Sequence, residues 1–186
     1  MERDASKKVL VPFADGMEEL EAICIVDILR RAGISVCTVS ITGTLEVTAS
    51  RGTKHIPDEL LENINSSRFD MIVLPGGGRG TENLANNPTV LSILKNFNES
   101  GKMIGAICAA PSILLKEGIV EIGDSFTGFP GSVPEVKGYE RSPFVVNGKI
   151  ITGLGPGFAI EFSLEIVKAL LGYDKYSEVK KGLLLS

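Results

Sequence analysis

Tryptophan is absent from this sequence, histidine occurs once (His55), and cysteine occurs three times. With one histidine and no cluster of Cys and His residues, we expect no metal site. The three cysteines are odd in number and widely spaced, so they predict no disulfide framework. They favour a reducing compartment, most simply the cytoplasm.

Basic residues are also few: 19 Lys and Arg stand against 23 Asp and Glu, which gives a net charge of −4. A surface without a basic surplus does not neutralise phosphates, so we expect no nucleic-acid partner. No apolar run approaches membrane-spanning length and no secretory hydrophobic segment is present, so we expect no membrane association.

The sequence does contain enough apolar residues for a full core, 44% of 186 residues, and 21 glycines. There is no linker, repeat or low-complexity tract. At this length we therefore predict a single domain over residues 1–186.

Short apolar runs alternate with longer amphipathic segments along the chain. Strands are predicted at residues 9–13, 34–41, 69–74, 103–108 and 149–152, and helices at residues 17–32, 88–100, 112–116 and 159–171. We also predict a hairpin over residues 45–56, a short polar helix around residues 60–61, and short strands and turns over residues 121–147. Strand, helix and strand at this spacing require parallel strands, so the pattern predicts a doubly wound α/β sandwich with its ligand site beyond the carboxyl ends of the strands.

Cys108 is the candidate nucleophile, because it lies where a buried strand passes abruptly into small residues and a helix. Free N–H groups at the start of that helix favour a negative charge, so we expect a lowered thiol pKa and a reactive thiolate. The arrangement is like the nucleophile elbow of hydrolases, with sulfur in place of oxygen. The alternative is that Cys108 is a small buried hydrophobic residue.

Glu21 is the second candidate. On a helical wheel with ~100° per residue it lies in the middle of the apolar arc, among Met17, Cys24, Ile25, Ile28 and Ala32. Burial there raises a carboxyl pKa, and a protonated carboxyl can donate a hydrogen bond to a thiolate or move a proton. The alternative is that the helix end is less buried and Glu21 reaches water.

The glycine-rich residues 76–80 match neither the dinucleotide-binding pattern, because Thr81 replaces its last glycine, nor the P-loop, so we expect no nucleotide cofactor. Their N–H groups could face an oxyanion, or the run is a plain tight turn. His55 is interpreted as a surface or strand residue, although a Cys–His pair stays open. Cys24 and Cys37 are interpreted as core residues, and residues 175–181 as a solvated charged face.

Four motifs taken together are more specific than any one of them. They are GMEELEA at residues 16–22, LPGG at 74–77, AICAAP at 106–111 and GPG at 155–157 with Glu161 and Phe162. In order and over nearly the whole chain, they resemble the ThiJ/PfpI superfamily, and within it the branch of the parkinsonism-associated deglycase (DJ-one type) and its bacterial relatives. The resemblance implies a flavodoxin-like fold of the class I glutamine amidotransferase-like kind, usually a homodimer.

The resemblance also assigns roles. It matches the reactive cysteine to Cys108 and its partner glutamate, which lowers the cysteine pKa and stabilises the sulfinate, to Glu21. The backbone groups on the oxyanion side match Gly76, Gly77 and Ala109. The family's arginines near the pocket, partly from a dimer partner, match Arg31 and Arg51. Two further pocket residues are Phe129 and Pro156.

Two departures from the family pattern bear on activity. The protease-like branch has histidine after the cysteine, where Ala109 stands here, so we expect no peptidase activity. The animal deglycase has histidine where Phe129 stands, although the bacterial relatives also have an aromatic residue there.

The resemblance implies a cofactor-independent deglycase or glyoxalase acting on small dicarbonyls or glycated amines and thiols. The alternatives are a redox sensor whose Cys108 stops at sulfinate, and a chaperone that acts through its dimer.

Overall fold

The computed structural model describes residues 7–185 and contains a central seven-stranded sheet with the order β5-β2-β1-β6-β7-β9-β8. Its strands are β1 (Lys8–Phe13), β2 (Ser35–Ser40), β5 (Glu59–Leu60), β6 (Met71–Leu74), β7 (Met103–Ile107), β8 (Phe144–Asn147) and β9 (Ile150–Gly153). Within this sheet, as described over residues 7–185, β8 is the only strand that pairs in the antiparallel direction, and its neighbour is β9. The mostly parallel sheet confirms the predicted α/β fold class.

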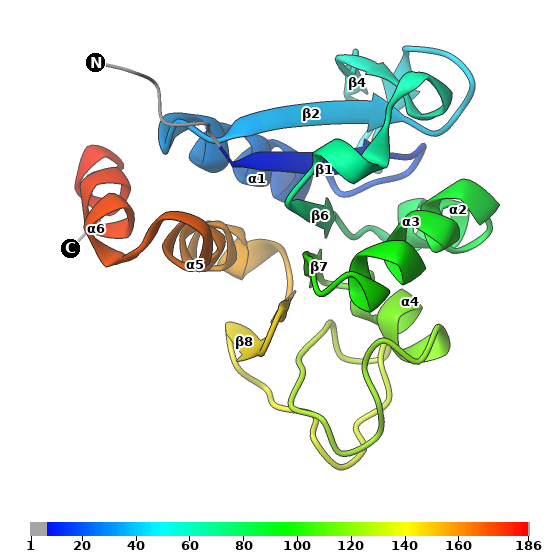
Figure 1. The fold of residues 1–186 in the computed structure, drawn as a ribbon. Helices are drawn as coiled ribbons and strands as arrows, with labels where there is room; N and C mark the ends of the chain where they lie inside the picture. Colours follow the sequence, from blue (N-terminus) through cyan, green and yellow to red (C-terminus); the bar gives the residue numbers. More distant parts are fainter. Residues whose placement is uncertain (1–6, 186) are drawn as a thin grey trace.

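Helices cover both faces of the sheet, as Figure 1 shows. On one face lie α1 (Glu19–Arg31), α5 (Ala159–Leu171) and α6 (Tyr173–Gly182), and on the other α2 (Gly78–Ala85), α3 (Pro88–Glu99) and α4 (Pro111–Lys116). The short 3-10 helices are η1 (Leu61–Asn63), η2 (Ser66–Arg68) and η3 (Pro156–Phe158). Each face has its own cluster of buried apolar side chains.

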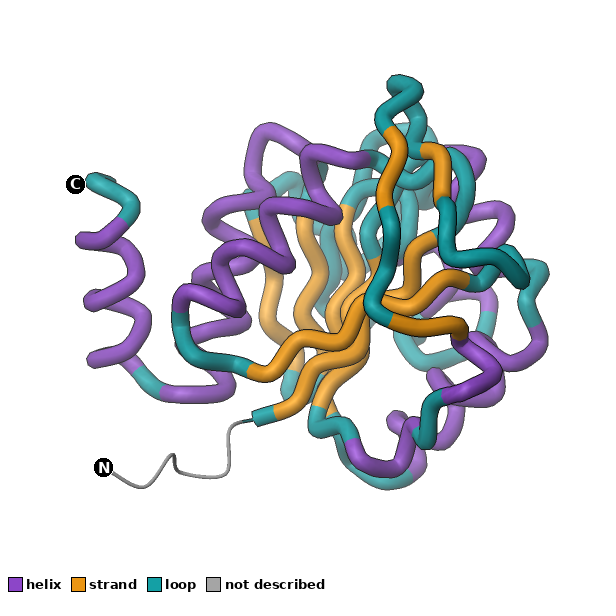
Figure 2. The backbone as a smooth tube through the Cα atoms, turned by 90° about the horizontal axis from the view of Figure 1, so that it is seen from above, coloured by secondary structure: helices purple, strands orange, loops and turns teal. Residues whose placement is uncertain are grey.

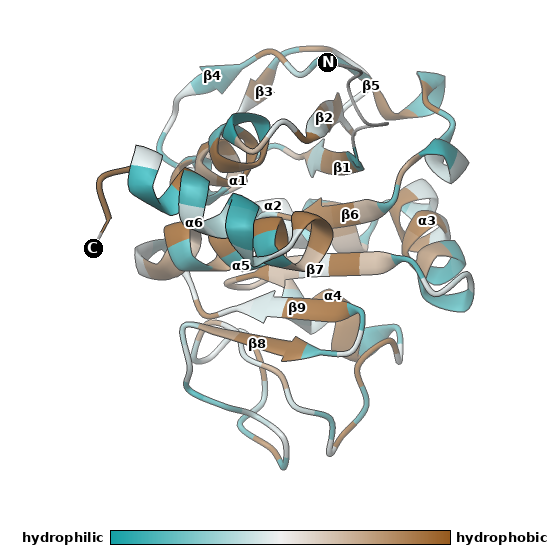
Figure 3. Ribbon diagram, turned by 60° about the vertical axis from the view of Figure 1, so that its left-hand side comes forward, coloured by the Kyte–Doolittle hydropathy of each residue, from teal (hydrophilic) through white to brown (hydrophobic). Residues whose placement is uncertain are grey.

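The strands form where the sequence places continuous apolar runs, because a parallel sheet is buried on both faces. All four residues of β6 are buried, as are the last five residues of β1. Figure 3 shows apolar residues on β6 and β7 and hydrophilic residues on α6. Val179 is the one buried residue of α6.

The predicted hairpin is confirmed as a separate two-stranded sheet of β3 (Val47–Thr48) and β4 (Lys54–His55), which are antiparallel. In Figure 2, loops and turns gather beyond one end of the sheet strands. The turn at Asn147 and Gly148 is confirmed as the connection between β8 and β9.

Two elements of the structure, α2 and β5, were not predicted from the sequence. Helix α2 was not predicted, since its first residues are glycine-rich. The short polar helix expected around residues 60–61 is present as the 3-10 helix η1, and the edge strand β5, which was not predicted, precedes it because residues 59–60 pair with the free edge of β2. The solvated charged face expected at residues 175–181 is confirmed as the outer side of helix α6, which packs on α5 and buries only Val179.

Candidate active site

Cys108 immediately follows β7 with a backbone φ of 64°, in the left-handed region that non-glycine residues rarely occupy. Its N–H donates to the carbonyl of Gly153 over 2.9 Å, and its own carbonyl accepts from the N–H of Phe129 over 2.7 Å. Holding a non-glycine residue in this conformation costs about 1–3 kcal/mol. The strand, the strained residue and the helix after it form the elbow geometry.

Glu21 lies in the first turns of α1 and its side chain is 0% exposed. Its Oε2 accepts the N–H of Gly76 over 2.8 Å. Its other oxygen, Oε1, has no hydrogen-bond partner of good geometry within residues 7–185. The carboxyl is nevertheless near enough to Cys108 for each group to affect the pKa of the other. The prediction of a buried carboxyl is confirmed, and the alternative that Glu21 reaches water is wrong.

Gly76 is where the loop after β6 passes between these two side chains. A Cβ atom at this position would lie 2.6 Å from Cys108 Cβ and 2.7 Å from Glu21 Oε2. Such separations are too short for any side chain, so only glycine fits here. Because the Gly76 N–H is donated to Glu21, it positions the carboxyl rather than facing the cysteine.

Burial raises the pKa of Glu21 to about 7, a change that the hydrogen bonds from Gly76 and Cys108 reduce and the charge of Glu18 increases. Burial also raises the pKa of Cys108 to about 12, together with the charge of Glu21 and the hydrogen bond to it. The N–H groups of Gly77 and Ala109 act in the opposite direction. The prediction that the elbow lowers the pKa of Cys108, and the lowering by Glu21 that the resemblance implies, are therefore wrong, because burial and the carboxylate beside the thiol outweigh two backbone donors.

The two groups form one coupled acid, since each disfavours ionisation of the other. The pair loses its first proton near the pKa of Glu21, about 7, and its second near that of Cys108, about 12. Between these values one proton is shared, and a thiolate exists only while Glu21 keeps that proton. The site is thus built to hold one negative charge.

The structure brings most of the sequence-predicted residues together around the elbow. Gly77 and Ala109 direct N–H groups at Cys108, and Phe129 is hydrogen-bonded to it through the backbone and is 45% exposed. Gly155, which precedes the half-buried Pro156, lies against the Phe129 ring, since a Cβ on that glycine would meet the ring at 3.3 Å. These residues form one wall beside the cysteine.

The two predicted arginines lie elsewhere. Arg51 is exposed on the turn between β3 and β4, where its N–H donates to Glu19. Arg31 ends α1, ten residues or about 15 Å along the helix from Glu21, and pairs with Asp27 over 2.6 Å. A single chain does not bring Arg31 to the elbow.

The remaining candidates take no part in the elbow. His55 lies on β4, as the strand interpretation predicts, with its Nε2 2.8 Å from the Thr53 hydroxyl and its ring edge-on to Phe13. Cys24 and Cys37 are half-buried and pack against the two core clusters, and burial raises the pKa of both thiols. Both behave as core thiols rather than nucleophiles.

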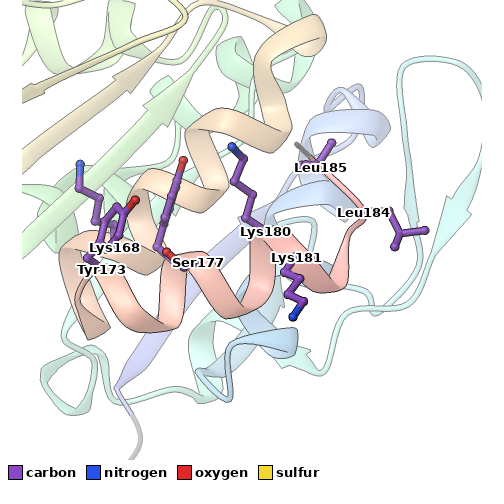
Figure 4. A pocket seen from close by; sticks show the side chains of 8 residues that line it. Lys168, Tyr173, Ser177, Lys180, Lys181, Leu184 and Leu185 are labelled. Atoms are coloured by element: carbon purple, nitrogen blue, oxygen red, sulfur yellow. The ribbon is translucent and has the colours of Figure 1, made fainter.

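Sequence reasoning missed Arg79, which lines two polar depressions near the elbow. The signal was its place in a glycine run directly after a strand. A separate groove on α5 and α6 includes none of the elbow residues. Eight residues line it, and Figure 4 labels all of them except Tyr176: Lys168, Tyr173, Tyr176, Ser177, Lys180, Lys181, Leu184 and Leu185.

Within residues 7–185 no helix is long and apolar enough to span a membrane. The fold and the site together define an α/β protein of the flavodoxin-like type with a cysteine elbow and a buried glutamate partner. Residues 7–169 match the DJ-1/PfpI family, and the chain belongs to that family.

Two relatives match over almost their whole length. Protein dj-1beta of Drosophila melanogaster is 40% identical over 97% of this chain and 98% of the relative, and its crystal structure superposes with a TM-score of 0.91 over 97% and 99% of the two chains. The glutathione-independent glyoxalase DJR-1.2 of Caenorhabditis elegans is 35% identical over 100% of both chains.

Proposed function

We propose that this protein is a cysteine-dependent, cofactor-independent glyoxalase or deglycase of the cytoplasm, formed by one domain over residues 1–186. The observation that supports it best is the strained Cys108 beside a fully buried Glu21, a pair that holds one proton near neutral pH. The relative named a glutathione-independent glyoxalase favours the same chemistry.

In this proposal the Cys108 thiolate adds to the aldehyde carbon of methylglyoxal, and the carbonyl π electrons move to oxygen, which the Gly77 and Ala109 N–H groups stabilise. Glu21 first gives its proton to this oxyanion, and the resulting carboxylate moves the proton from the former aldehyde carbon to the neighbouring carbonyl carbon, while the hydroxyl proton passes to the oxygen of that second carbon. The first carbon is thereby oxidised and the second reduced, which gives a lactoyl thioester without an external oxidant. Water releases lactate and returns the thiol; glyoxal gives glycolate in the same way.

A glycated amine enters the same sequence as its aminocarbinol, with the amine as leaving group. The substrates are small dicarbonyls and their adducts with amines or thiols. Ala109 supplies no histidine after the nucleophile, which supports the absence of peptidase activity.

The test compares Cys108→Ser and Cys24→Ser variants for lactate production from methylglyoxal without glutathione. We expect a loss of at least about 100-fold for Cys108→Ser, because a hydroxyl has a much higher pKa than a thiol, and no significant loss for Cys24→Ser. Equal turnover by the wild type and Cys108→Ser would contradict the proposal.

A second candidate is a redox sensor in which Cys108 is oxidised to sulfinate. It is favoured by the Glu21 carboxyl near Cys108, whose Oε1 has no hydrogen-bond partner within residues 7–185, and by the two N–H groups that could bind sulfinate oxygens. Gain of two oxygen atoms at Cys108 under low peroxide, together with negligible turnover, would support it. Chaperone activity, the third alternative, would persist in the Cys108→Ser variant.

We also propose a homodimer formed through the outer face of α1. Leu20 and Ile23 lie three residues apart on that face and remain 54% and 42% exposed. Ile160, at the start of the neighbouring α5, is 39% exposed. Exposed apolar residues gathered on two packed helices are typical of an association surface, and a partner could bring its Arg31 to the pocket.

A further inference from the structure

A polar depression lies beside the loop that faces Cys108. It has a volume of about 530 Å³ and is lined by Asp15, Gly16, Thr48, Ala49, Ser50, Arg51, Gly78 and Arg79. A second depression shares Asp15 and Arg79 and continues to Thr42 and Asn83. Arg79 therefore borders both, and the space is sufficient for a small molecule of several non-hydrogen atoms.

The position of this depression in the fold is one where ligands bind. From β1 the chain continues outward to β2 on one side, whereas β6 leads to β7 on the other. Asp15 follows β1 and Arg79 follows β6, so both lie at the carboxyl ends of the two strands where the order reverses. Doubly wound sheets bind ligands in this crevice.

The lining offers donors that the protein itself does not use. Arg51 and Arg79 are exposed, and within residues 7–185 neither guanidinium forms a salt bridge or hydrogen bond. The N–H groups of Gly78 and Arg79, at the start of α2, likewise donate no hydrogen bond in this part of the chain.

The opposing carboxylates have partners. Asp15 accepts the N–H of Thr48 over 2.8 Å, and Glu18 and Glu19 accept the Ser50 hydroxyl over 3.0 and 2.8 Å. These carboxylates offset part of the positive charge of the arginines, but they already accept hydrogen bonds from the protein. The groups that remain available to a ligand are guanidinium and N–H donors, which select an anion.

The depression adjoins the loop that faces the reacting sulfur, because its lining begins at Gly78, directly after Gly77. The N–H of Gly77 is directed at Cys108. Arg79 follows Gly77 by two residues, so the Cα atoms of Gly77 and Arg79 are at most about 7.6 Å apart. We propose that Arg79 binds a carboxylate or phosphate group of the molecule that reacts with Cys108. This inference rests on the proposed function only for the identity of the substrate, which would include anionic carbonyl compounds beside neutral methylglyoxal.

The test uses two alkylating agents that differ in charge and need no turnover. Iodoacetate is anionic and iodoacetamide is neutral, and the rate of Cys108 modification by each is followed by mass spectrometry of its peptide. In Arg79→Met the ratio of the iodoacetate rate to the iodoacetamide rate should fall by about threefold to tenfold, because one unit charge is lost within roughly 10 Å. Methionine keeps an apolar stem over Gly16, against which the Arg79 stem packs.

Two controls make the result specific. Arg79→Lys should retain most of the wild-type ratio, and Arg68→Gln, in η2 before β6, removes the same charge from the amino ends of the strands. An unchanged ratio in Arg79→Met, or an equal fall in Arg68→Gln, would overturn the proposal.

Competition identifies the anionic group. Acetate and inorganic phosphate are added at constant ionic strength, and the one that slows iodoacetate modification in the wild type but not in Arg79→Met is the group bound. Failure of both to compete would also contradict the proposal. Since alkylation does not depend on glyoxalase turnover, loss of the proposed function would leave this result unaffected.

Discussion

The reactivity of Cys108 depends on which of two side chains holds a proton. Glu21 is fully buried, with a backbone N–H on one oxygen and the thiol beside it, and each group disfavours the ionisation of the other. A negative charge can therefore occupy the carboxylate or the sulfur but not both at neutral pH. The backbone donors of Gly77 and Ala109 stabilise it on sulfur.

Glu21 should make stability depend on pH. Its folded-state pKa is about 7, above the ordinary 4.5 of the unfolded chain, so the folded protein binds more protons between these values. The contribution of Glu21 to stability is thus fully present below about pH 4.5 and is lost as the pH rises through 7. Relative to the wild type, Glu21→Gln should gain about 2–3 kcal/mol in free energy of unfolding between pH 5 and pH 8.

Urea unfolding of both proteins at the two pH values measures this difference. Glu165→Gln is the control, since Glu165 is nearly as buried but pairs with Lys168 at the surface. A difference between Glu21→Gln and the wild type that does not change with pH would contradict a raised pKa.

The residues of the site and the raised pKa of Glu21 could be predicted from the sequence, but the direction of the Cys108 pKa could not. Cys108 stood at a strand–helix boundary and Glu21 in an apolar arc, and both positions are local patterns. The raised pKa of Cys108 results first from burial and then from a carboxyl 87 residues away along the chain, and no local pattern reports either.

At the scale of elements, the site is assembled where two loops approach without side chains between them. A Cβ at Gly77 would lie 2.5 Å from the carbonyl oxygen of Gly16, and one at Gly80 would lie 2.5 Å from Met17 Cα. This close packing holds the start of α2 against the start of α1. It also explains the missed helix: the glycines that weaken helix propensity are required by tertiary contact, which propensity does not include.

Glu19 fastens the β3–β4 turn to α1. Its carboxylate accepts the hydroxyls of Ser50 and Thr53 and the N–H of Arg51. Burial opposes ionisation of this carboxyl, but these hydrogen bonds and that of its own backbone outweigh it and lower the pKa to about 2. The contribution is therefore present above about pH 4.5 and is lost as the pH falls through 2.

Glu19→Ala should loosen this turn while leaving the sheet intact. We expect hydrogen exchange at the Arg51 amide to accelerate by about tenfold, since the loss of one charged acceptor is worth roughly 1–2 kcal/mol. Glu46→Ala, which removes an exposed ion pair with Lys54 on the same hairpin, serves as the control. Equal acceleration in both variants would show that Glu19 has no special role.

At the scale of the whole molecule, the question is whether one chain completes the pocket. The parallel sheet and its two layers of helices followed from the alternating pattern, because each βαβ unit is encoded locally. The place of Arg31 did not follow, since the single chain leaves it at the far end of α1. Its predicted role requires a second copy.

Leu20→Lys should dissociate the proposed dimer, because it places a charge at the centre of the exposed apolar face of α1. Light scattering should then give the mass of one chain, 19.8 kDa, in place of twice that value. Ile122→Lys changes a residue that is 77% exposed and lies outside that face, and it should leave the mass unchanged. A wild type that is monomeric at micromolar concentration would contradict the dimer.

The most direct test of the coupled pair is the rate of Cys108 alkylation by iodoacetamide as a function of pH, in the wild type and in Glu21→Gln. The wild-type rate should rise through about pH 7 and reach a plateau before a second rise toward pH 12, since the pair loses its protons in two steps. In Glu21→Gln the step near pH 7 should disappear. A single step near the ordinary thiol value of about 8.5 in both proteins would show that Glu21 does not control the cysteine.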